Sequence, residues 1–368
     1  MKKMLFSPIL IKQKNYKKNM NMKNYLKTVL FFLCLMAFSS KANAQESEMA
    51  ILKHNGEVSY FYGASSFSEA YQACVSGDEI ILSAGRFDSE NTFTDSNQEK
   101  KNLIIRGAGA DPNGKELTMI YSSNSSISIN GSTLTIEGIW FTKEVYSYVE
   151  NSNISKCRFT CYLAYGTNPD NCFINCLFDD LFEAEKDGKF YNCIINSADI
   201  QNNPASFFNC IFVGNDDTYL SNAGNVFYEN CIFATARISG SYYTPFNNSQ
   251  CRNCMMIFSS DSERPEEYNP FEASLSNTNR TIRGDFSTIF KTFDGTYNVE
   301  ERYELNDDAK SKYKGTDETE IGINGGSFPF SMTVSSSHIL SKKIDTVTKN
   351  GKLHVNIKLG FDDAPQSK

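Results

Sequence analysis

Short alternating segments recur through the middle of the chain. Each alternates apolar and other residues over five or six positions, which is the periodicity of a β-strand. Between them lie Gly, Asn, Asp and Ser, the residues that favour turns. No segment has room for a long helix, so the pattern predicts an all-β chain built from many short strands.

A cysteine marks the same place in six of these segments. The shared pattern is Φ-x-N-C-x-Φ, where Φ is apolar, and the cysteines follow one another at spacings of 19, 17, 17, 21 and 23 residues. We call them the cysteine ladder: Cys157, Cys176, Cys193, Cys210, Cys231 and Cys254. Five are preceded by an asparagine, and these form the asparagine row: Asn175, Asn192, Asn209, Asn230 and Asn253. Upstream, Gly138 and Ile139 match the same frame.

A short-strand repeat of this period predicts a solenoid, in which each coil buries its inner face on its neighbours. Parallel strands of successive coils lie about 4.8 Å apart, so equivalent residues form ladders. We expect each ladder cysteine and the apolar residue two positions later to point inward together. Asparagine tolerates the left-handed conformation, so we expect the asparagine row to form the bends between strands and to hydrogen-bond from coil to coil.

The segment before the repeat indicates how the solenoid begins. Residues 66–71, SFSEAY, predict a short helix that caps the exposed end of the first coil. Residues 77–87, GDEIILSAGRF, and residues 102–109, NLIIRGAG, resemble the first two coils of the pectin-lyase-like superfamily of parallel β-helix proteins. The resemblance covers residues 50–330 and implies a right-handed single-stranded parallel β-helix with an N-terminal capping helix.

The end of the chain departs from the repeat. Residues 259–330 lose the cysteine pattern and predict irregular closing coils, so the β-helix is expected to span residues 45–330. Residues 315–330 resemble the closing segment of uncharacterised secreted β-helix proteins of the Bacteroidota type. Asn350 and Gly351 form a turn signal between two alternating strands, so residues 331–368 predict a C-terminal β-hairpin tail. A secretion-sorting tail is an alternative.

Residues 1–44 predict a secretory signal peptide. They contain nine Lys and no acid, an apolar run at residues 28–38, and an Ala-Asn-Ala cleavage pattern before Gln45. The apolar run is too short to span a membrane, and no later segment is long enough either. Cys34 lies inside the run, which disfavours a lipoprotein anchor there. We therefore expect export to the periplasm, the cell surface or the medium.

Setting the leader aside changes the charge. The whole chain has 36 basic and 43 acidic residues, a net charge of −7, but residues 45–368 keep 27 of the basic and all 43 of the acidic ones, a net of −16. A protein that neutralises phosphates needs an excess of Lys and Arg, so this balance argues against a nucleic-acid partner. It also disfavours electrostatic steering of an anionic polysaccharide.

Many β-helix proteins act on polysaccharides, so charged residues in the repeat are catalytic candidates. A glycosidase needs two carboxylates about 5–9 Å apart, and a lyase needs a base with Ca²⁺ or a cation to neutralise a uronate. The candidates are Asp179, Asp180, Asp216, Asp217, Arg158, Lys186, Lys189 and Arg237. The two Asp pairs lie three and six residues after their ladder cysteines, and the Gly-His-Gly and Arg-x-Lys motifs of the hydrolase branch are absent. Calcium is expected only for a lyase.

The cysteines and tyrosines have non-catalytic interpretations. Buried cysteines act as small hydrophobes, and without neighbouring His they predict no metal site. Export permits oxidation, so three pairs are candidate disulfides: Cys157/Cys161, Cys172/Cys176 and Cys251/Cys254. Aromatic rings pack on sugar rings, which makes the tyrosines near the ends of repeat units candidate glycan contacts: Tyr162, Tyr165, Tyr219, Tyr242 and Tyr243. The alternative is that they only cover the ladders.

These observations favour a non-enzymatic exported protein that binds a glycan or another cell-envelope component, or that has a structural role at the cell surface. The first alternative is a polysaccharide lyase or glycoside hydrolase. The second is a protein-interaction scaffold or adhesin that docks through residues 331–368. The sequence makes no prediction of the oligomeric state.

Overall fold

The fold is taken from a computed structural model. It describes residues 48–89, 101–123, 126–130, 133–161, 163–165, 170–183, 187–199, 204–214, 226–234, 246, 249–259, 267–272, 278–334, 338–344 and 355–360. The predicted leader, residues 1–44, lies outside them. Within the described part of the chain, no helix has the length and apolar character needed to cross a membrane.

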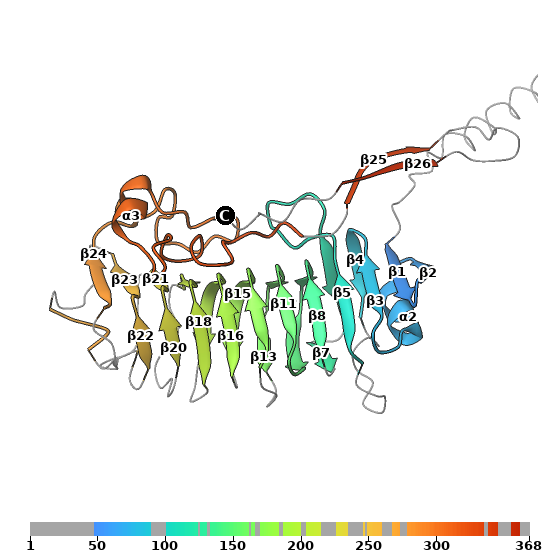
Figure 1. Cartoon of the computed structure of the whole chain (residues 1–368), viewed down its shortest axis with the longest axis horizontal. Helices are drawn as coiled ribbons and strands as arrows, with labels where there is room; N and C mark the ends of the chain where they lie inside the picture. The colour runs from blue at the N-terminus through green and yellow to red at the C-terminus, as the bar shows by residue number, and fades with distance from the viewer. Residues whose placement is uncertain are drawn as a thin grey trace, which may run out of the picture. The chain divides into compact units, whose positions relative to one another are not determined.

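Short parallel strands stack into two sheets, which confirms the predicted all-β parallel solenoid (Figure 1). From β14 to β23 the strands alternate between the sheets, so each coil adds one strand to both. The 11-stranded sheet has the order β2 (Glu57–Tyr62), β1 (Met49–His54), β3 (Glu79–Leu82), β5 (Leu103–Arg106), β8 (Leu134–Glu137), β11 (Asn153–Ser155), β14 (Cys172–Ile174), β16 (Gly188–Tyr191), β18 (Ala205–Phe208), β20 (Phe227–Glu229) and β22 (Gln250–Arg252).

The second sheet has 13 strands in the described residues. Its main path is β24 (Arg280–Arg283), β23 (Met255–Phe258), β21 (Ile232–Ala234), β19 (Ile211–Phe212), β17 (Ile194–Asp199), β15 (Leu177–Glu183), β12 (Arg158–Phe159), β9 (Trp140–Phe141), β6 (Thr118–Tyr121) and β4 (Gly85–Asp88). Off this path lie β7 (Ser126–Asn130), β10 (Glu144–Tyr148) and β13 (Leu163–Tyr165). Strand β24 shows that the parallel stacking continues beyond residue 259.

The bend between the two sheets depends on a left-handed residue directly before each ladder position. The asparagine row occupies this conformation with φ between 52° and 56°, and Lys156 (φ 53°) and Gly138 (φ 70°) occupy it in the earlier coils. Asparagine and glycine adopt it at low cost. The repeated Asn-Cys pair therefore sets where every coil turns from one sheet into the next.

The inside of the solenoid is filled by ladders of like residues. All six ladder cysteines are fully buried, and the ten cysteines from Cys74 to Cys254 are free thiols, so none of the candidate disulfides is formed. Phenylalanines stack between coils, with ring centroids 5.3 Å apart for Phe159 and Phe178 and 4.7 Å apart for Phe190 and Phe207. Aromatic stacking adds about 0.5–1.5 kcal/mol per pair to the burial of apolar area.

A second apolar core lies outside the solenoid. The residue after each ladder cysteine points outward from the 13-stranded sheet, for example Leu177, Ile194 and Ile232, yet these side chains are buried. Residues 286–313, which we call the cover, pack on them and include η1 (Phe286–Thr288) and α3 (Asp307–Lys312). The chain itself thus closes the outer face of this sheet from β15 to β23.

The segment that follows the cover, residues 314–334, runs back along the asparagine row, and we call it the strap (Figure 1). Every asparagine of the row donates a hydrogen bond from its side-chain amide to the strap. Four of them donate to backbone carbonyl oxygens: Asn253 to Lys314 O (2.9 Å), Asn209 to Gly322 O (3.3 Å), Asn192 to both Ile323 O and Gly325 O (2.7 Å each) and Asn175 to Pro329 O (3.4 Å). Asn230 donates to the side-chain oxygen Thr316 Oγ1 (3.2 Å). The row was expected to bond to itself, but only Asn253 to Asn230 (2.8 Å) does so among the described bonds.

The glycines of the strap allow it to lie this close. Gly322 has φ 82°, and a Cβ there would come within 2.5 Å of Ile232 Cδ1; Gly326 has φ 72° and lies beside Asn209. The sequence predicted that the segment with Gly325 and Gly326 forms an irregular closing coil. In the structure this segment does not add a coil to the solenoid but runs across several coils.

The remaining described elements lie at either end of the sequence. Helix α2 (Ser66–Ala73) buries Phe67, Ala70 and Tyr71, which share one face at helical spacing, against the first strands. Strands β1 and β2 form an antiparallel hairpin, and β1 also pairs antiparallel with β3. In the predicted tail, β25 (His338–Ile344) and β26 (Val355–Gly360) form a two-stranded antiparallel sheet.

The strap bonds give a testable stability effect. Asn192→Ala removes two hydrogen bonds to strap carbonyls and places Ala in the left-handed conformation, so we expect a loss of about 3 kcal/mol in the free energy of unfolding. Asn192→Gly removes the same bonds but tolerates the conformation, and should lose about 1 kcal/mol less. Denaturant titration measures both, and equal losses would contradict the role of the bend.

Candidate functional site

The catalytic candidates Arg158 and Asp179 lie side by side on neighbouring strands of the 13-stranded sheet. Arg158 Nε is 2.7 Å from Asp179 Oδ2, and their side chains are only 12% and 9% exposed. The guanidinium lies 4.4 Å from the centre of the Trp140 ring, which adds a cation–π contact. Both charged groups are thus held by each other and by the surrounding protein.

Tyr297 from the cover closes this cluster. Its hydroxyl donates to Asp179 Oδ1 at 2.6 Å, so each carboxylate oxygen already has a partner. Burial and the nearby Asp179 charge raise the pKa of Tyr297 well above its usual range, which keeps the hydroxyl protonated and donating. The arrangement stabilises the contact between cover and sheet, and it leaves Asp179 poorly placed to accept a proton from a substrate.

The other charged candidates do not join this pair. Asp180 is exposed, and Lys189 lies in β16 of the other sheet, where its Nζ is 3.6 Å from Asp170 with both side chains at least half exposed. Lys186, Asp216, Asp217 and Arg237 lie outside the described residues. Within the described ranges, no group of three His, Cys, Asp or Glu side chains is arranged to hold a metal ion.

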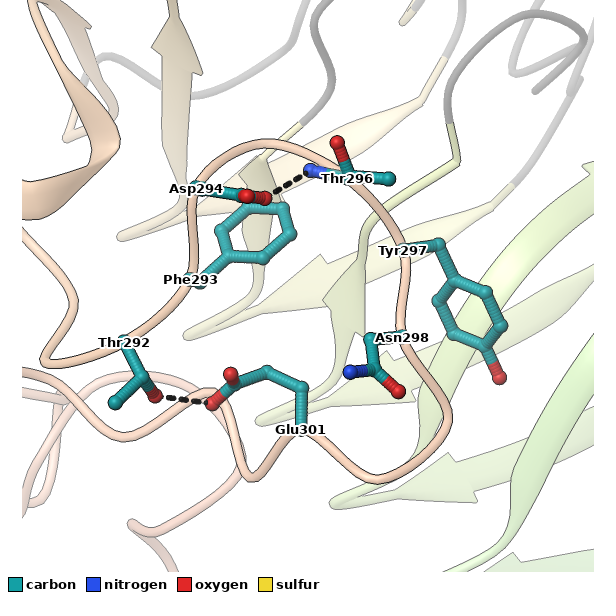
Figure 2. Close-up of a pocket in the computed structure, with 7 residues that line it drawn as sticks. All are labelled: Thr292, Phe293, Asp294, Thr296, Tyr297, Asn298 and Glu301. Carbon is teal, nitrogen blue, oxygen red and sulfur yellow. Dashed lines mark hydrogen bonds between the residues drawn. The ribbon is translucent and has the colours of Figure 1, made fainter.

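The cover forms a small polar pocket, and Tyr297 is one of its lining residues (Figure 2). Its volume is about 330 Å³, at the lower end of the range for ligand sites. The lining residues are Thr292, Phe293, Asp294, Thr296, Tyr297, Asn298 and Glu301. Most of the polar groups are engaged within the loop itself: Thr292 donates to Glu301 at 2.6 Å, and the Thr296 amide donates to Asp294 at 2.9 Å. Of its two aromatic residues, Phe293 is buried and Tyr297 is held by its hydrogen bond to Asp179.

A different surface carries stacked aromatic rings. On the outer face of the 11-stranded sheet, Tyr191 and Phe208 stack at 4.9 Å with planes 10° apart, and Phe208 lies 5.6 Å from Phe227. Phe328 of the strap meets the Tyr191 ring edge-on at 5.6 Å and is 42% exposed. We call these four residues the outer aromatic row. Three are half-buried, so part of each ring faces solvent.

The register of the strands explains the positions of Tyr191 and Phe208 in this row. Tyr191 and Phe208 directly precede asparagines of the asparagine row, and the strands pair Tyr191 with Phe208 and, in the coil before, with Ile174. Since side chains alternate across a strand, the residue before each asparagine faces outward while its predecessor, such as Phe190, faces the core. The sequence signal for these outward rings is therefore present in Tyr-Asn-Cys and Phe-Asn-Cys, although neither residue was among the predicted glycan contacts.

Charged groups border the outer aromatic row. At one end lies the half-exposed Lys189, in the same strand as Tyr191. At the other, Arg252 Nη1 is 3.4 Å from Glu229 Oε1, and Arg252 is 59% exposed. Thr316 of the strap also donates to Glu229, at 2.7 Å. An aromatic surface with a polar border has the composition expected of a ligand-binding face.

Most of the tyrosines predicted to contact a glycan lie outside the described residues. Tyr162, Tyr219, Tyr242 and Tyr243 are outside the described residues, and Tyr165 is described only as the last residue of β13. Comparisons of the chain with protein-family models, with curated proteins and with solved structures give no match. The functional interpretation therefore depends on the residues of this chain alone.

The buried ion pair predicts an asymmetry between two adjacent acids. Asp179→Asn leaves the Arg158 guanidinium buried without its counter-charge, so we expect a loss of about 3 kcal/mol in the free energy of unfolding. Asp180→Asn, at the exposed neighbouring position, should change it by no more than about 0.5 kcal/mol. Thermal or denaturant unfolding of the two variants measures these changes. Equal losses of stability would show that the Arg158–Asp179 ion pair does not stabilise the fold.

The raised pKa of Tyr297 predicts a pH dependence. Its folded pKa lies above the unfolded value of about 10, so its contribution is fully present below pH 10 and is lost as pH rises through the folded pKa. The stability advantage of the native chain over Tyr297→Phe should shrink by about 1 kcal/mol between pH 10 and pH 11. Denaturant titrations of both chains measure this difference, and a constant difference would contradict a buried, hydrogen-bonded hydroxyl.

Proposed function

We propose that this chain is an exported right-handed parallel β-helix, of the pectin-lyase-like kind, that binds a glycan without cleaving it. Residues 1–44 direct export, helix α2 caps the first coil, and residues 331–368 form a hairpin tail. The glycan lies on the outer aromatic row. The observation that carries the proposal is the stacked pair of Tyr191 and Phe208 on the outer face of the 11-stranded sheet, with Phe227 tilted against Phe208 and Phe328 edge-on to Tyr191.

The geometry of the row suits an extended sugar chain. Tyr191 and Phe208 lie in register on neighbouring strands, and Phe227 on the next strand is displaced by two residues, so the three rings cross three coils along the solenoid axis. Aromatic faces pack on the apolar faces of sugar rings, and the tyrosine hydroxyl adds a polar contact. Lys189, Glu229 and Arg252 at the borders supply groups for sugar hydroxyls. The formal charge of −16 for residues 45–368 favours a neutral or cationic glycan.

The state of Arg158 and Asp179 supports binding over cleavage. A lyase or hydrolase needs a base or acid that can reach the substrate. Here the carboxylate is nine-tenths buried, and both its oxygens are used by Arg158 and Tyr297. Closure of the outer face of the 13-stranded sheet from β15 to β23 by the cover also removes that part of the face as a substrate platform.

Binding to a panel of neutral, cationic and anionic polysaccharides tests the proposal. The double variant Tyr191→Ala, Phe208→Ala removes two stacking faces, and we expect its affinity for a retained glycan to fall at least about tenfold. Asp294→Ala alters the cover pocket and leaves the aromatic row intact, so it should bind like the native chain.

The same incubations are scored for new reducing ends and unsaturated uronates. Retention of a glycan with neither product supports the proposal. Release of either product by the native chain, or equal binding by the double variant, would contradict it.

A further inference from the structure

Strand β2 combines exposed apolar side chains with an open backbone edge. It stands at one end of the 11-stranded sheet formed by the described residues, where β1 is its pairing partner. Five large apolar residues are exposed in the described part of the chain, and three of them occupy alternate positions of β2: Val58 (45%), Tyr60 (57%) and Tyr62 (64%). Exposed apolar side chains gathered on one strand mark an interaction surface.

The hairpin geometry shows which backbone groups face the open edge. The β1–β2 turn has two residues, Asn55 and Gly56, both with positive φ, and the flanking pair is His54 with Glu57. In such a hairpin the flanking pair is hydrogen-bonded, and bonded pairs alternate along the ladder. The Gly63 amide donates to Glu48 O at 2.7 Å, as expected if the pair Glu48–Gly63 continues this alternation of bonded pairs beyond Ala50–Phe61. The odd-numbered residues of β2 therefore bond to β1.

The even-numbered residues direct their N–H and C=O groups away from β1. These are Val58, Tyr60 and Tyr62, the same residues whose side chains are exposed. The strand lacks the usual protection of a free edge, because it contains no Pro and no Lys and pairs with β1 without a bulge. Its one charged residue is Glu57, at its first position.

We propose that β2 pairs antiparallel with β2 of a second copy, so that two solenoids join end to end through one continuous sheet. A two-fold axis at Tyr60 places Tyr60 opposite itself and Val58 opposite Tyr62. Each of these three pairs has outward backbone groups on both strands, and a bonded antiparallel pair exchanges two hydrogen bonds. This register alone uses every outward group of Val58, Tyr60 and Tyr62 in both copies.

Side chains and charges agree with the same register. Val58, Tyr60 and Tyr62 of both copies meet on one face, where cross-strand aromatic pairs are favourable. Glu57 falls opposite Gly63, so the two carboxylates do not meet. A two-fold arrangement of identical strands is also closed, and so yields a dimer without a growing filament. Phe61, on the opposite face, packs on the core that contains α2 and keeps the strand in place.

Sedimentation of the purified native chain over about a hundredfold range of concentration tests the pairing. We expect a concentration-dependent dimer. Tyr60→Lys places two like charges directly opposite each other across the axis and should raise the dimer dissociation constant at least about tenfold, with an unchanged melting temperature. Phe328→Lys, at another exposed apolar position, in the strap (42% against 57% for Tyr60), should leave the dimer intact.

Cross-linking tests the register itself. In a bonded antiparallel pair the Cα atoms lie about 5.5 Å apart, within the range for a disulfide. Tyr60→Cys should therefore cross-link to its own copy under mild oxidation, while Tyr62→Cys, which faces Val58, should not. A native chain that remains monomeric throughout, a dimer that survives Tyr60→Lys, or equal cross-linking of both cysteine variants would overturn the proposal. A monomer that instead captures a strand from another protein would also overturn it.

Discussion

The left-handed bend before each ladder position is the constraint on which the rest of the structure depends. It requires a residue that accepts positive φ, and asparagine meets that requirement while keeping a side-chain amide. Glycine would make the same bend but would provide no donor. Because the bends stack, their amides form a line along the solenoid, and that line is the docking site for the strap.

The position of the strap in turn determines which surfaces are closed. The cover and strap share one apolar core with the outward residues of the 13-stranded sheet, so this face is internal to the chain. Tyr297 of the cover reaches Asp179, which converts a charged pair into part of the interface. The 11-stranded sheet keeps its outer face open, and Phe328 of the strap extends the aromatic surface there. Among the described residues, the chain thus closes one side of the solenoid and leaves aromatic side chains of the other side partly exposed.

Much of the fold could be predicted from the sequence, and part of the fold and of the candidate site could not. The Asn-Cys repeat predicted the solenoid, because its period and its alternation leave few other architectures. The strap was not predictable, since it has no periodicity and its contacts span large separations in sequence, 154 residues between Asn175 and Pro329. The closure of the Arg158–Asp179 pair was not predictable, because the residue that closes it, Tyr297, lies 118 residues beyond Asp179. Strand alternation predicts that Tyr191 and Phe208 face outward, whereas the predicted glycan contacts were tyrosines near the ends of the repeat units.

Hydrogen exchange at single amides tests most directly whether the asparagine row both bends the coils and holds the strap. In the native chain the Thr316 amide donates to Asn230 Oδ1 at 2.9 Å, whereas the Ile232 amide donates to Cys210 O between coils. Asn230→Gly keeps the bend and removes the acceptor. We expect faster exchange at Thr316 with protection retained at Ile232. Equal loss of protection at both amides, or no change at Thr316, would contradict the separate roles of the asparagine row in bending the coils and in holding the strap.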